Sequence, residues 1–219
     1  LATKKEKQRE FAYSARLYQD ILNRFPKNTA ARKGLKSVQN RPAFKGPFPQ
    51  EPPEDQIQHI TKLYNNVALI AASEAGASLL REFPEAAILH NLMGAIAMGL
   101  GAFAQAETSF ERMKLIDPYS AENHYNLGNA RLKQDKTNLA INSFQLAILL
   151  NPEFSNAHNS LGIALKSAGQ IEPALHRYRK AIEIDPNFAE AFYNMGNLFK
   201  DEGNLEDAKR CFKSSLAIE

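Results

Sequence analysis

Cysteine, tryptophan and long apolar runs are scarce or missing in this 219-residue sequence, which has one cysteine, Cys211, and no tryptophan. A single cysteine excludes an internal disulfide framework and a cysteine-rich zinc site. It favours a reducing compartment, so we expect a cytoplasmic location. A membrane-spanning helix needs about 18 apolar residues, and three glycines interrupt the longest apolar stretch, 92–103. The chain opens at Leu1 with a lysine-rich stretch unlike a signal peptide and stops within a helical pattern, so we expect a piece of a longer protein.

Signatures of catalysis are missing as well. The sequence has no ordered Ser/His/Asp set, no glycine-rich phosphate loop and no His-Glu-x-x-His motif, so we expect no enzyme activity, no catalytic residue and no cofactor. His90, His124 and His158 recur every 34 residues. Equivalent positions on packed helices lie roughly 10 Å apart, whereas zinc binds nitrogen at about 2.1 Å, so we predict that these histidines pack and hold no metal. Cys211 is expected to be a structural thiol, although the basic residues beside it could instead lower its pKa.

Positive charge gathers at the start of the chain. Residues 1–45 carry twelve basic and three acidic residues, a net +9, whereas the other 174 residues carry a net −6. Such asymmetry fits either a solvated helix face or an arm that docks on something negative. Binding of nucleic acid or anionic lipid is the weaker expectation, because the segment lacks aromatic side chains arranged for base stacking.

Four small or aromatic features recur at a period of 34 residues. They are the prolines that follow a helix, a glycine in each first helix, and an alanine and an aromatic residue in each second helix. The series are Pro118, Pro152 and Pro186; Gly128, Gly162 and Gly196; Ala140, Ala174 and Ala208; and Phe144, Tyr178 and Phe212. Glycine and alanine let two antiparallel helices approach closely, and the aromatic ring fills the adjoining gap. This period and small–large pattern resemble the tetratricopeptide repeat.

The resemblance implies an all-α fold, a right-handed α-solenoid of antiparallel helix pairs. The expected units are 53–86 (atypical), 87–120, 121–154, 155–188 and 189–219, in an array over 54–219. We expect first helices at 122–134, 156–168 and 190–202, and second helices at 138–151, 172–184 and 206–218. Residues 1–40 form a basic helical segment that resembles a degenerate repeat, with helices at 11–25 and 28–38. Five prolines in residues 41–53 indicate an extended linker.

The turn of the atypical unit 53–86 departs from the pattern. Later units place Gly101, Asp135, Gly169 or Gly203 at the end of the first helix, where a left-handed residue suits the turn. This unit holds Val67 there, and valine resists positive φ. We therefore expect a turn that is reshaped or absorbed into one continuous helix.

The inner faces of the first helices are the candidate binding site. In tetratricopeptide arrays these helices line a concave surface, which implies a set of peptide-contacting residues in this chain. The set is Tyr125, Asn126, Asn129, Lys133, Asn159, Lys166, Tyr193, Asn194, Asn197 and Lys200. An asparagine side chain both donates and accepts hydrogen bonds without charge, so a column of asparagines can bind a peptide backbone whatever its side chains. The alternative is that asparagine is merely a tolerated polar residue there.

Two family likenesses refine this expectation. Asn126 and Asn194 match part of the asparagine ladder in the superhelix of O-linked N-acetylglucosamine transferase, and Leu92 and Ser160 depart from it. The stretches NLGNA, ALKSAGQIEPAL and AIEIDPNFAEAFYNMGN resemble the repeat regions of bacterial sulfotransferase or glycosyltransferase fusion proteins. The lysines do not match the carboxylate clamp of chaperone-binding arrays.

Two functions follow as expectations. The first is a protein–protein interaction scaffold that holds a peptide or partner helix in its groove. The alternative is a substrate-presenting or oligomerising arm of a larger transferase whose catalytic domain lies outside these residues. We also expect self-association through the array ends, since solenoid ends without a polar cap present apolar surface. The sequence beyond Glu219 would separate the two functions.

Overall fold

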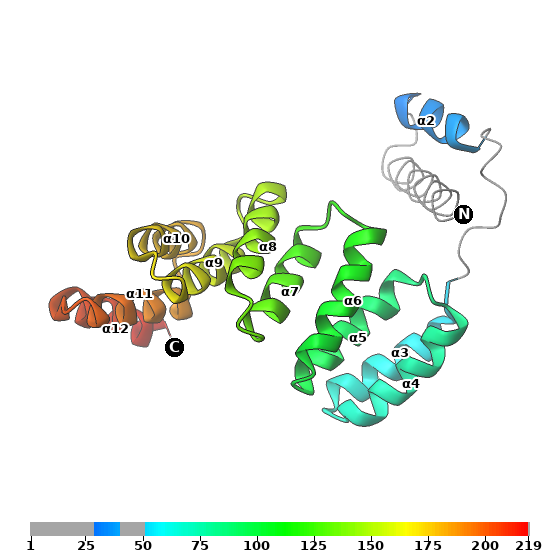
Figure 1. Ribbon diagram of the computed structural model, residues 1–219, viewed down its shortest axis with the longest axis horizontal. Coiled ribbons are helices and arrows are strands. Elements are labelled where there is room, and N and C mark those ends of the chain that lie inside the picture. Colours follow the sequence, from blue (N-terminus) through cyan, green and yellow to red (C-terminus); the bar gives the residue numbers. More distant parts are fainter. Residues whose placement is uncertain (1–28, 40–50, 219) are drawn as a thin grey trace. The chain divides into compact units, whose positions relative to one another are not determined.

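The computed structural model describes residues 29–39 and 51–218, and every regular element within them is an α-helix (Figure 1). The chain divides into two compact units, residues 1–53 with 83–86 and residues 54–82 with 87–219. In the first unit, α2 (Thr29–Gln39) covers the helix predicted at 28–38. The helix predicted at 11–25 and most of the linker predicted at 41–53 lie outside the described residues.

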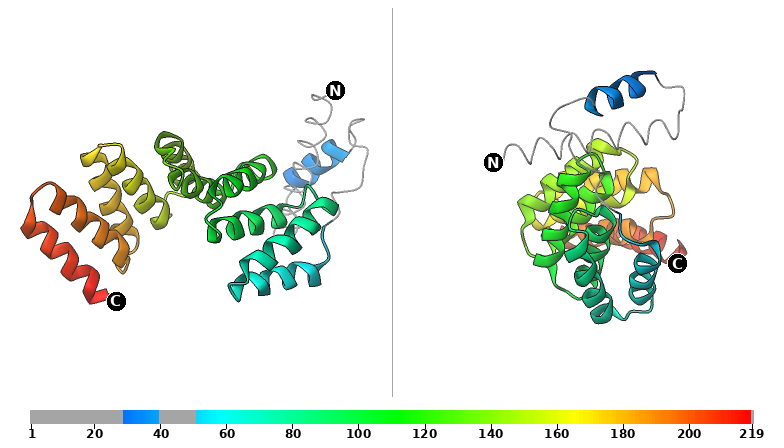
Figure 2. Two further views of the ribbon diagram at one scale, coloured as in Figure 1. Left: turned by 60° about the horizontal axis from the view of Figure 1, so that its bottom comes forward. Right: turned by 90° about the vertical axis from the view of Figure 1, so that its right-hand side faces the viewer.

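The second unit consists of helices that pair in chain order. The helices are α3 (Glu54–Asn65), α4 (Leu69–Glu82), α5 (Ala87–Gly99), α6 (Phe103–Ile116), α7 (Ala121–Leu132), α8 (Thr137–Leu150), α9 (Ser155–Ser167), α10 (Ile171–Ile184), α11 (Ala189–Asp201) and α12 (Leu205–Ile218). Each odd-numbered helix packs against the even-numbered helix that follows it, and each even-numbered helix packs against the next pair. Figure 2 shows the antiparallel course of α11 and α12 near the C-terminus. The fold is the predicted all-α solenoid, and from α7 to α12 the helix bounds lie within about two residues of those expected.

The repeated glycines mark the closest approach within each pair. A Cβ built at Gly162 of α9 would lie 2.6 Å from Cε1 of Tyr178, and one at Gly128 of α7 would lie 2.5 Å from Cε1 of Phe144. Both aromatic rings are buried, as are the second-helix alanines. The predicted small–large contact is therefore confirmed.

The atypical pair α3–α4 reverses this arrangement of large and small residues. Ile60 stands where later units hold the glycine, and Gly76 stands where they hold the aromatic residue. Ile60 is fully buried, and the sulfur of Met93, from the following pair, occupies the space beside Gly76. The next pair, and not the first helix of this pair, thus fills the space beside Gly76, and the small–large pattern is lost, which explains the weak match of this unit.

The turn at Val67 is a correction to the sequence analysis. Ala68 donates its backbone N–H to the Leu63 carbonyl at 2.9 Å, as Ala102 does to Ala97 at 2.8 Å in the next unit. Val67 has φ 60°, close to the 71° of Gly101. The turn is thus neither reshaped nor absorbed. Its geometry is imposed by the packed helices on either side, and the Val67 side chain, 77% exposed, has room in solvent.

Replacing Val67 with glycine should stabilise the protein. A left-handed backbone costs an L-residue about 1–2 kcal/mol, and the greater freedom of glycine in the unfolded chain offsets about 0.4–1 kcal/mol of that. We expect Val67→Gly to raise the free energy of unfolding by about 0.5–1 kcal/mol, measured by urea denaturation. Asp135→Gly, at φ 57°, is the matched control and should gain less, since aspartate tolerates this conformation. A loss of stability in Val67→Gly would contradict the assigned strain.

His124 and His158 each form a hydrogen bond with the loop that precedes their own helix. Nε2 of His124 lies 2.9 Å from the Pro118 carbonyl, and Nε2 of His158 lies 2.9 Å from the Pro152 carbonyl. Both rings are buried, and burial lowers the pKa of His158. The packing role predicted for these two histidines is confirmed.

Candidate peptide-binding surface

The first helices of successive pairs are neighbours in space. Helix α9 contacts both α7 and α11, in addition to its own partner α10. Helix α9 therefore lies between α7 and α11, the two other helices that carry candidate residues.

Most of the candidate side chains on these helices are partly or fully exposed. Asn126, Asn129 and Asn197 are half-buried, and Lys133 and Lys200 are exposed. Tyr193 is 52% exposed, and its ring packs against that of Phe212, with ring centroids 5.7 Å apart. Tyr125 is half-buried and packs on Phe154 at 4.9 Å. The first helices α7 and α11 thus carry partly exposed amides, two tyrosine rings and two exposed lysines.

Asn159 does not belong to this set. Its side chain is only 2% exposed. It donates to the Glu190 carboxylate at 3.2 Å and accepts from Nδ2 of Asn194 at 3.1 Å. We correct the prediction that Asn159 contacts a ligand: it ties α9 to α11 instead, because the contact between neighbouring first helices covers it. Asn194 is half-buried, and its side-chain amide donates one hydrogen bond to Asn159.

Lys166 is also engaged between repeats. Its ammonium lies 2.5 Å from a carboxylate oxygen of Asp201 on α11. The hydrogen bond and the charge of Lys166 lower the pKa of Asp201. Lys133 and Lys200 therefore remain as the cations through which the surface could meet an acidic group.

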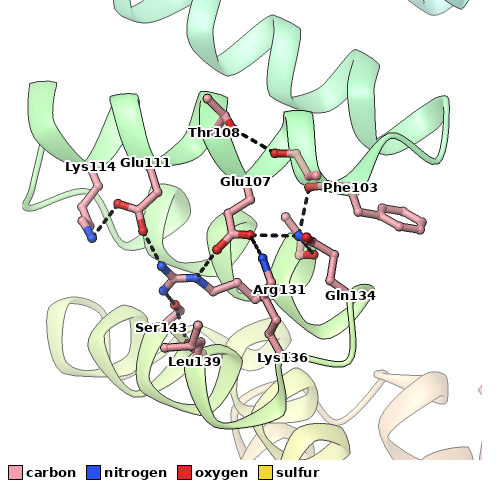
Figure 3. A network of polar contacts seen from close by, with 12 residues as sticks. Phe103, Glu107, Thr108, Glu111, Lys114, Arg131, Gln134, Lys136, Leu139 and Ser143 are labelled. Atoms are coloured by element: carbon pink, nitrogen blue, oxygen red, sulfur yellow. Dashed lines mark hydrogen bonds and ion pairs between the residues drawn. The ribbon is translucent and has the colours of Figure 1, made fainter.

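A partly buried polar network lies where α6, α7 and α8 meet, and the sequence analysis missed it (Figure 3). The Arg131 guanidinium of α7 donates to Glu107 at 3.0 Å, to Ser143 of α8 at 2.8 Å, and to Glu111. Lys136 lies 2.6 Å from the same Glu107 carboxylate. Figure 3 shows the guanidinium pointing from α7 towards both carboxylates of α6.

The repeat itself holds the signal for this network. The residues one period after Glu107 and Arg131 are Ile141 and Leu165, which are buried together in an apolar cluster with Leu175 and Tyr178. Glu107 and Arg131 thus form an ion pair at the interface where the next unit has an apolar contact. Desolvation by burial raises the pKa of Glu107, but hydrogen bonds from Lys136, Arg131 and Gln134 outweigh it and leave the pKa lowered.

Cys211 is buried on α12. Burial, followed by the charge of Asp207, raises the pKa of its thiol despite the neighbouring Arg210. The structural thiol is thus the correct alternative, because desolvation outweighs the positive field. Within the described ranges, no group of three or more His, Cys, Asp or Glu side chains is arranged to hold a metal ion. Among the same residues, no helix combines the length and apolar character that crossing a membrane requires.

The helix pairs, their period and their glycine contacts define a tetratricopeptide-repeat array. A family model described as "Tetratricopeptide repeat" matches residues 121–154 and 189–219, and one described as "TPR repeat" matches residues 164–203. The repeats of this chain are tetratricopeptide repeats.

Solved structures share the fold. A crystal structure of MamA is 28% identical, covers 73% of this chain and 93% of its own, and has a TM-score of 0.66. YrrB, described as a TPR protein with an unusual peptide-binding site, is 24% identical over 76% of this chain and 86% of its own, with a TM-score of 0.61. PilF of Pseudomonas aeruginosa is 17% identical over 76% of each chain, with a TM-score of 0.67. No curated protein sequence matches the chain.

Proposed function

We propose that this chain is a non-catalytic protein-interaction scaffold that binds an extended peptide along the first helices α7, α9 and α11. The observation that carries the proposal is the set of half-buried asparagines, Asn126 and Asn129 on α7 and Asn197 on α11, two helices that both contact α9. A peptide backbone presents one donor and one acceptor per residue, and asparagine can serve both. The amides therefore bind the backbone, and the exposed ring of Tyr193 contacts a peptide side chain.

The polar residues of this surface divide into two groups. Asn159 and Lys166 hold α9 to α11, so they shape the surface without contacting the ligand. For Asn126 and Asn197, by contrast, the described part of the chain contains no side-chain hydrogen-bond partner. Half-buried amides whose hydrogen bonds go only to solvent are well placed to exchange water for a ligand.

A reducing compartment such as the cytoplasm suits the free thiol of Cys211.

The alternative function, an arm of a larger transferase, stays a prediction, and the sequence of the whole gene would test it. A catalytic domain after Glu219 would favour the arm, and further repeats would favour the scaffold alone.

Removing the free amides should weaken peptide binding and leave folding intact. Peptides would be selected from a random display library on the full chain, and their affinity measured by fluorescence polarisation. Each lost hydrogen bond costs about 0.5–1.5 kcal/mol, so Asn126→Ala with Asn197→Ala should lose about 1–3 kcal/mol of binding energy with an unchanged melting temperature. Asn142→Ala, an exposed asparagine on the second helix α8, is the matched control. Selected peptides that bind the double variant as tightly as the parent would contradict the site.

A further inference from the structure

The last junction between repeats is more open than the junction before it. Helices α10 and α12 pack on α11 there, as α8 and α10 pack on α9 one period earlier. In the earlier junction, Leu161 and Leu165 of α9 are only 1% and 6% exposed. The same repeat positions on α11 hold Met195 and Phe199, and both are only partly buried. A cavity of about 330 Å³ lies beside them, which we name the α11 pocket.

The α11 pocket is lined largely by apolar side chains. Phe192, Met195 and Phe199 line it from α11, and Cys211 lines it from α12. The three α11 residues are partly exposed, so a ligand that enters the pocket would remove apolar surface from water. Small-molecule sites have volumes of about 300–1,000 Å³, a mostly apolar lining and a few polar groups that fix the orientation of the ligand. The α11 pocket lies at the small end of this range.

The polar groups of the α11 pocket include one unpaired cation. Arg179 of α10 and Arg210 of α12 both line the pocket, as does Asp207. Both oxygens of the Asp207 carboxylate are engaged, one by the Arg210 guanidinium and the other by the Asn204 amide at 2.5 Å. Arg179, by contrast, forms no hydrogen bond or ion pair with any residue that the structure describes. The guanidinium of Arg179 is therefore available to an anion from outside the chain.

An earlier junction shows which group pairs with a guanidinium at this place in the repeat. The residue two periods before Arg179 is Glu111 of α6. The residue two periods before Phe199 is Arg131 of α7, whose guanidinium forms an ion pair with Glu111. The last junction thus keeps a guanidinium at this pair of positions but has an aromatic ring in place of the carboxylate. A ligand that brings a carboxylate would restore the ion pair, and the ring would contact its apolar part.

A carboxylate fits the single guanidinium better than a phosphate does. Guanidinium and carboxylate groups are both planar and can form two parallel hydrogen bonds. A phosphate monoester carries about −1.5 to −2 charge at pH 7, so one guanidinium would leave part of that charge unpaired beside three apolar side chains, which is costly. The α11 pocket therefore favours a carboxylate that is attached to an apolar group.

We propose that the α11 pocket binds a small molecule in which a carboxylate is joined to an apolar or aromatic group. The carboxylate pairs with Arg179, and the apolar group packs against Phe192, Met195 and Phe199. Tyr193 and Asn197, which are proposed to bind peptide, are not among the residues that line this pocket. The inference therefore does not depend on the proposed function, and its test needs no peptide.

Methyl NMR of the four methionines tests this binding on the full chain. Carbon-13 labelling of the methionine methyl groups gives one signal per methionine, and the variant Met195→Leu assigns the signal of Met195. Phenylpropanoate should shift that signal with an affinity in the millimolar range, as expected for a ligand of this size. The signal of Met113, buried on α6, should not move. Phenylpropanamide has nearly the same shape without the charge and should bind about tenfold more weakly.

Two arginine variants show whether Arg179 holds the carboxylate. Arg179→Gln should lower the affinity for phenylpropanoate about tenfold and leave the affinity for the amide unchanged. The change is compatible with the fold, since α8 holds Gln145 at this position. Arg177→Gln, on the same helix but outside the pocket, is the matched control and should bind like the parent. Equal affinities of the parent for acid and amide, or equal losses in the two variants, would contradict the pairing.

The single cysteine gives a second readout of the α11 pocket. Cys211 lines the pocket and is the one thiol of the chain, so its rate of reaction with a small alkylating reagent reports access to the cavity. Phenylpropanoate at a concentration that saturates the parent should slow alkylation of the parent and slow that of Arg179→Gln much less. A Met195 signal that stays in place throughout the millimolar range, or that inorganic phosphate shifts equally, would overturn the proposal. An alkylation rate of the parent that the ligand leaves unchanged would also overturn it.

Discussion

Gly162→Ala should destabilise the protein, although the same change in an ordinary exposed helix interior stabilises by about 1 kcal/mol. The added methyl group would lie 2.6 Å from Cε1 of Tyr178, and that ring is 1% exposed and enclosed by the core. The larger Gly162→Leu should cost about 3 kcal/mol or more, at the upper end of the overpacking range. Each kilocalorie corresponds to about 2–4 °C in the melting temperature of a chain this size, so thermal melting by circular dichroism resolves both variants.

Two controls make this result specific to the contact between α9 and α10. Ser167→Leu adds the same side chain at an exposed position on α9 and should change the melting temperature little. Combining Gly162→Ala with Tyr178→Leu removes the ring that the methyl group meets, so the second change should cost less in the variant than in the parent. A Gly162→Ala protein that melts higher than the parent would contradict the close approach of the two helices.

Arg131→Leu should be the most destabilising single change in the polar network. The substitution leaves the Glu107 carboxylate, whose side chain is 15% exposed, with Lys136 and Gln134 but without its guanidinium partner, and losing hydrogen bonds to a charged group costs about 1.5–3 kcal/mol. Adding Glu107→Ile recreates the apolar pair that the next interface holds as Ile141 and Leu165. The double variant should therefore return to within about 1 kcal/mol of the parent or exceed it. Urea denaturation of the parent, both singles and the double measures this coupling.

The pH dependence of stability provides an independent check on the same network. The folded state lowers the pKa of Glu107, so the unfolded chain binds a proton more readily. The stabilisation is fully present above the unfolded pKa of about 4.3 and is lost as pH falls through the folded value. The parent should lose stability on acidification below that pH more steeply than the double variant. Parallel profiles for the two proteins would show that Glu107 contributes nothing through its charge.

The helices that carry the candidate residues could be predicted from the sequence because solenoid geometry assigns each repeat position to a helix and a face. Asn126 and Asn129 lie half-buried on α7, and Asn197 lies half-buried on α11; both helices contact α9. Asn159 occupies an equally favourable position but is covered, because it forms hydrogen bonds with Glu190 and Asn194 of α11. Periodicity assigns a residue to a face of its helix. Whether solvent reaches that residue depends on side chains of the next repeat that pack over it.

The 34-residue period was sufficient, from the sequence alone, to place α7 to α12 and their glycine–aromatic contacts. That is possible because close approach of two helices requires a small residue opposite a large one, and the requirement recurs in every pair. Tertiary structure alone decided the positive φ at Val67, the exchange of Ile60 and Gly76, and the ion pair of Arg131 and Glu107. Each depends on a neighbouring element: packed helices impose the turn, Met93 fills the space beside Gly76, and a carboxylate from α6 meets a guanidinium from α7. Such contacts join residues that no period relates, so they exist only once the pairs have stacked.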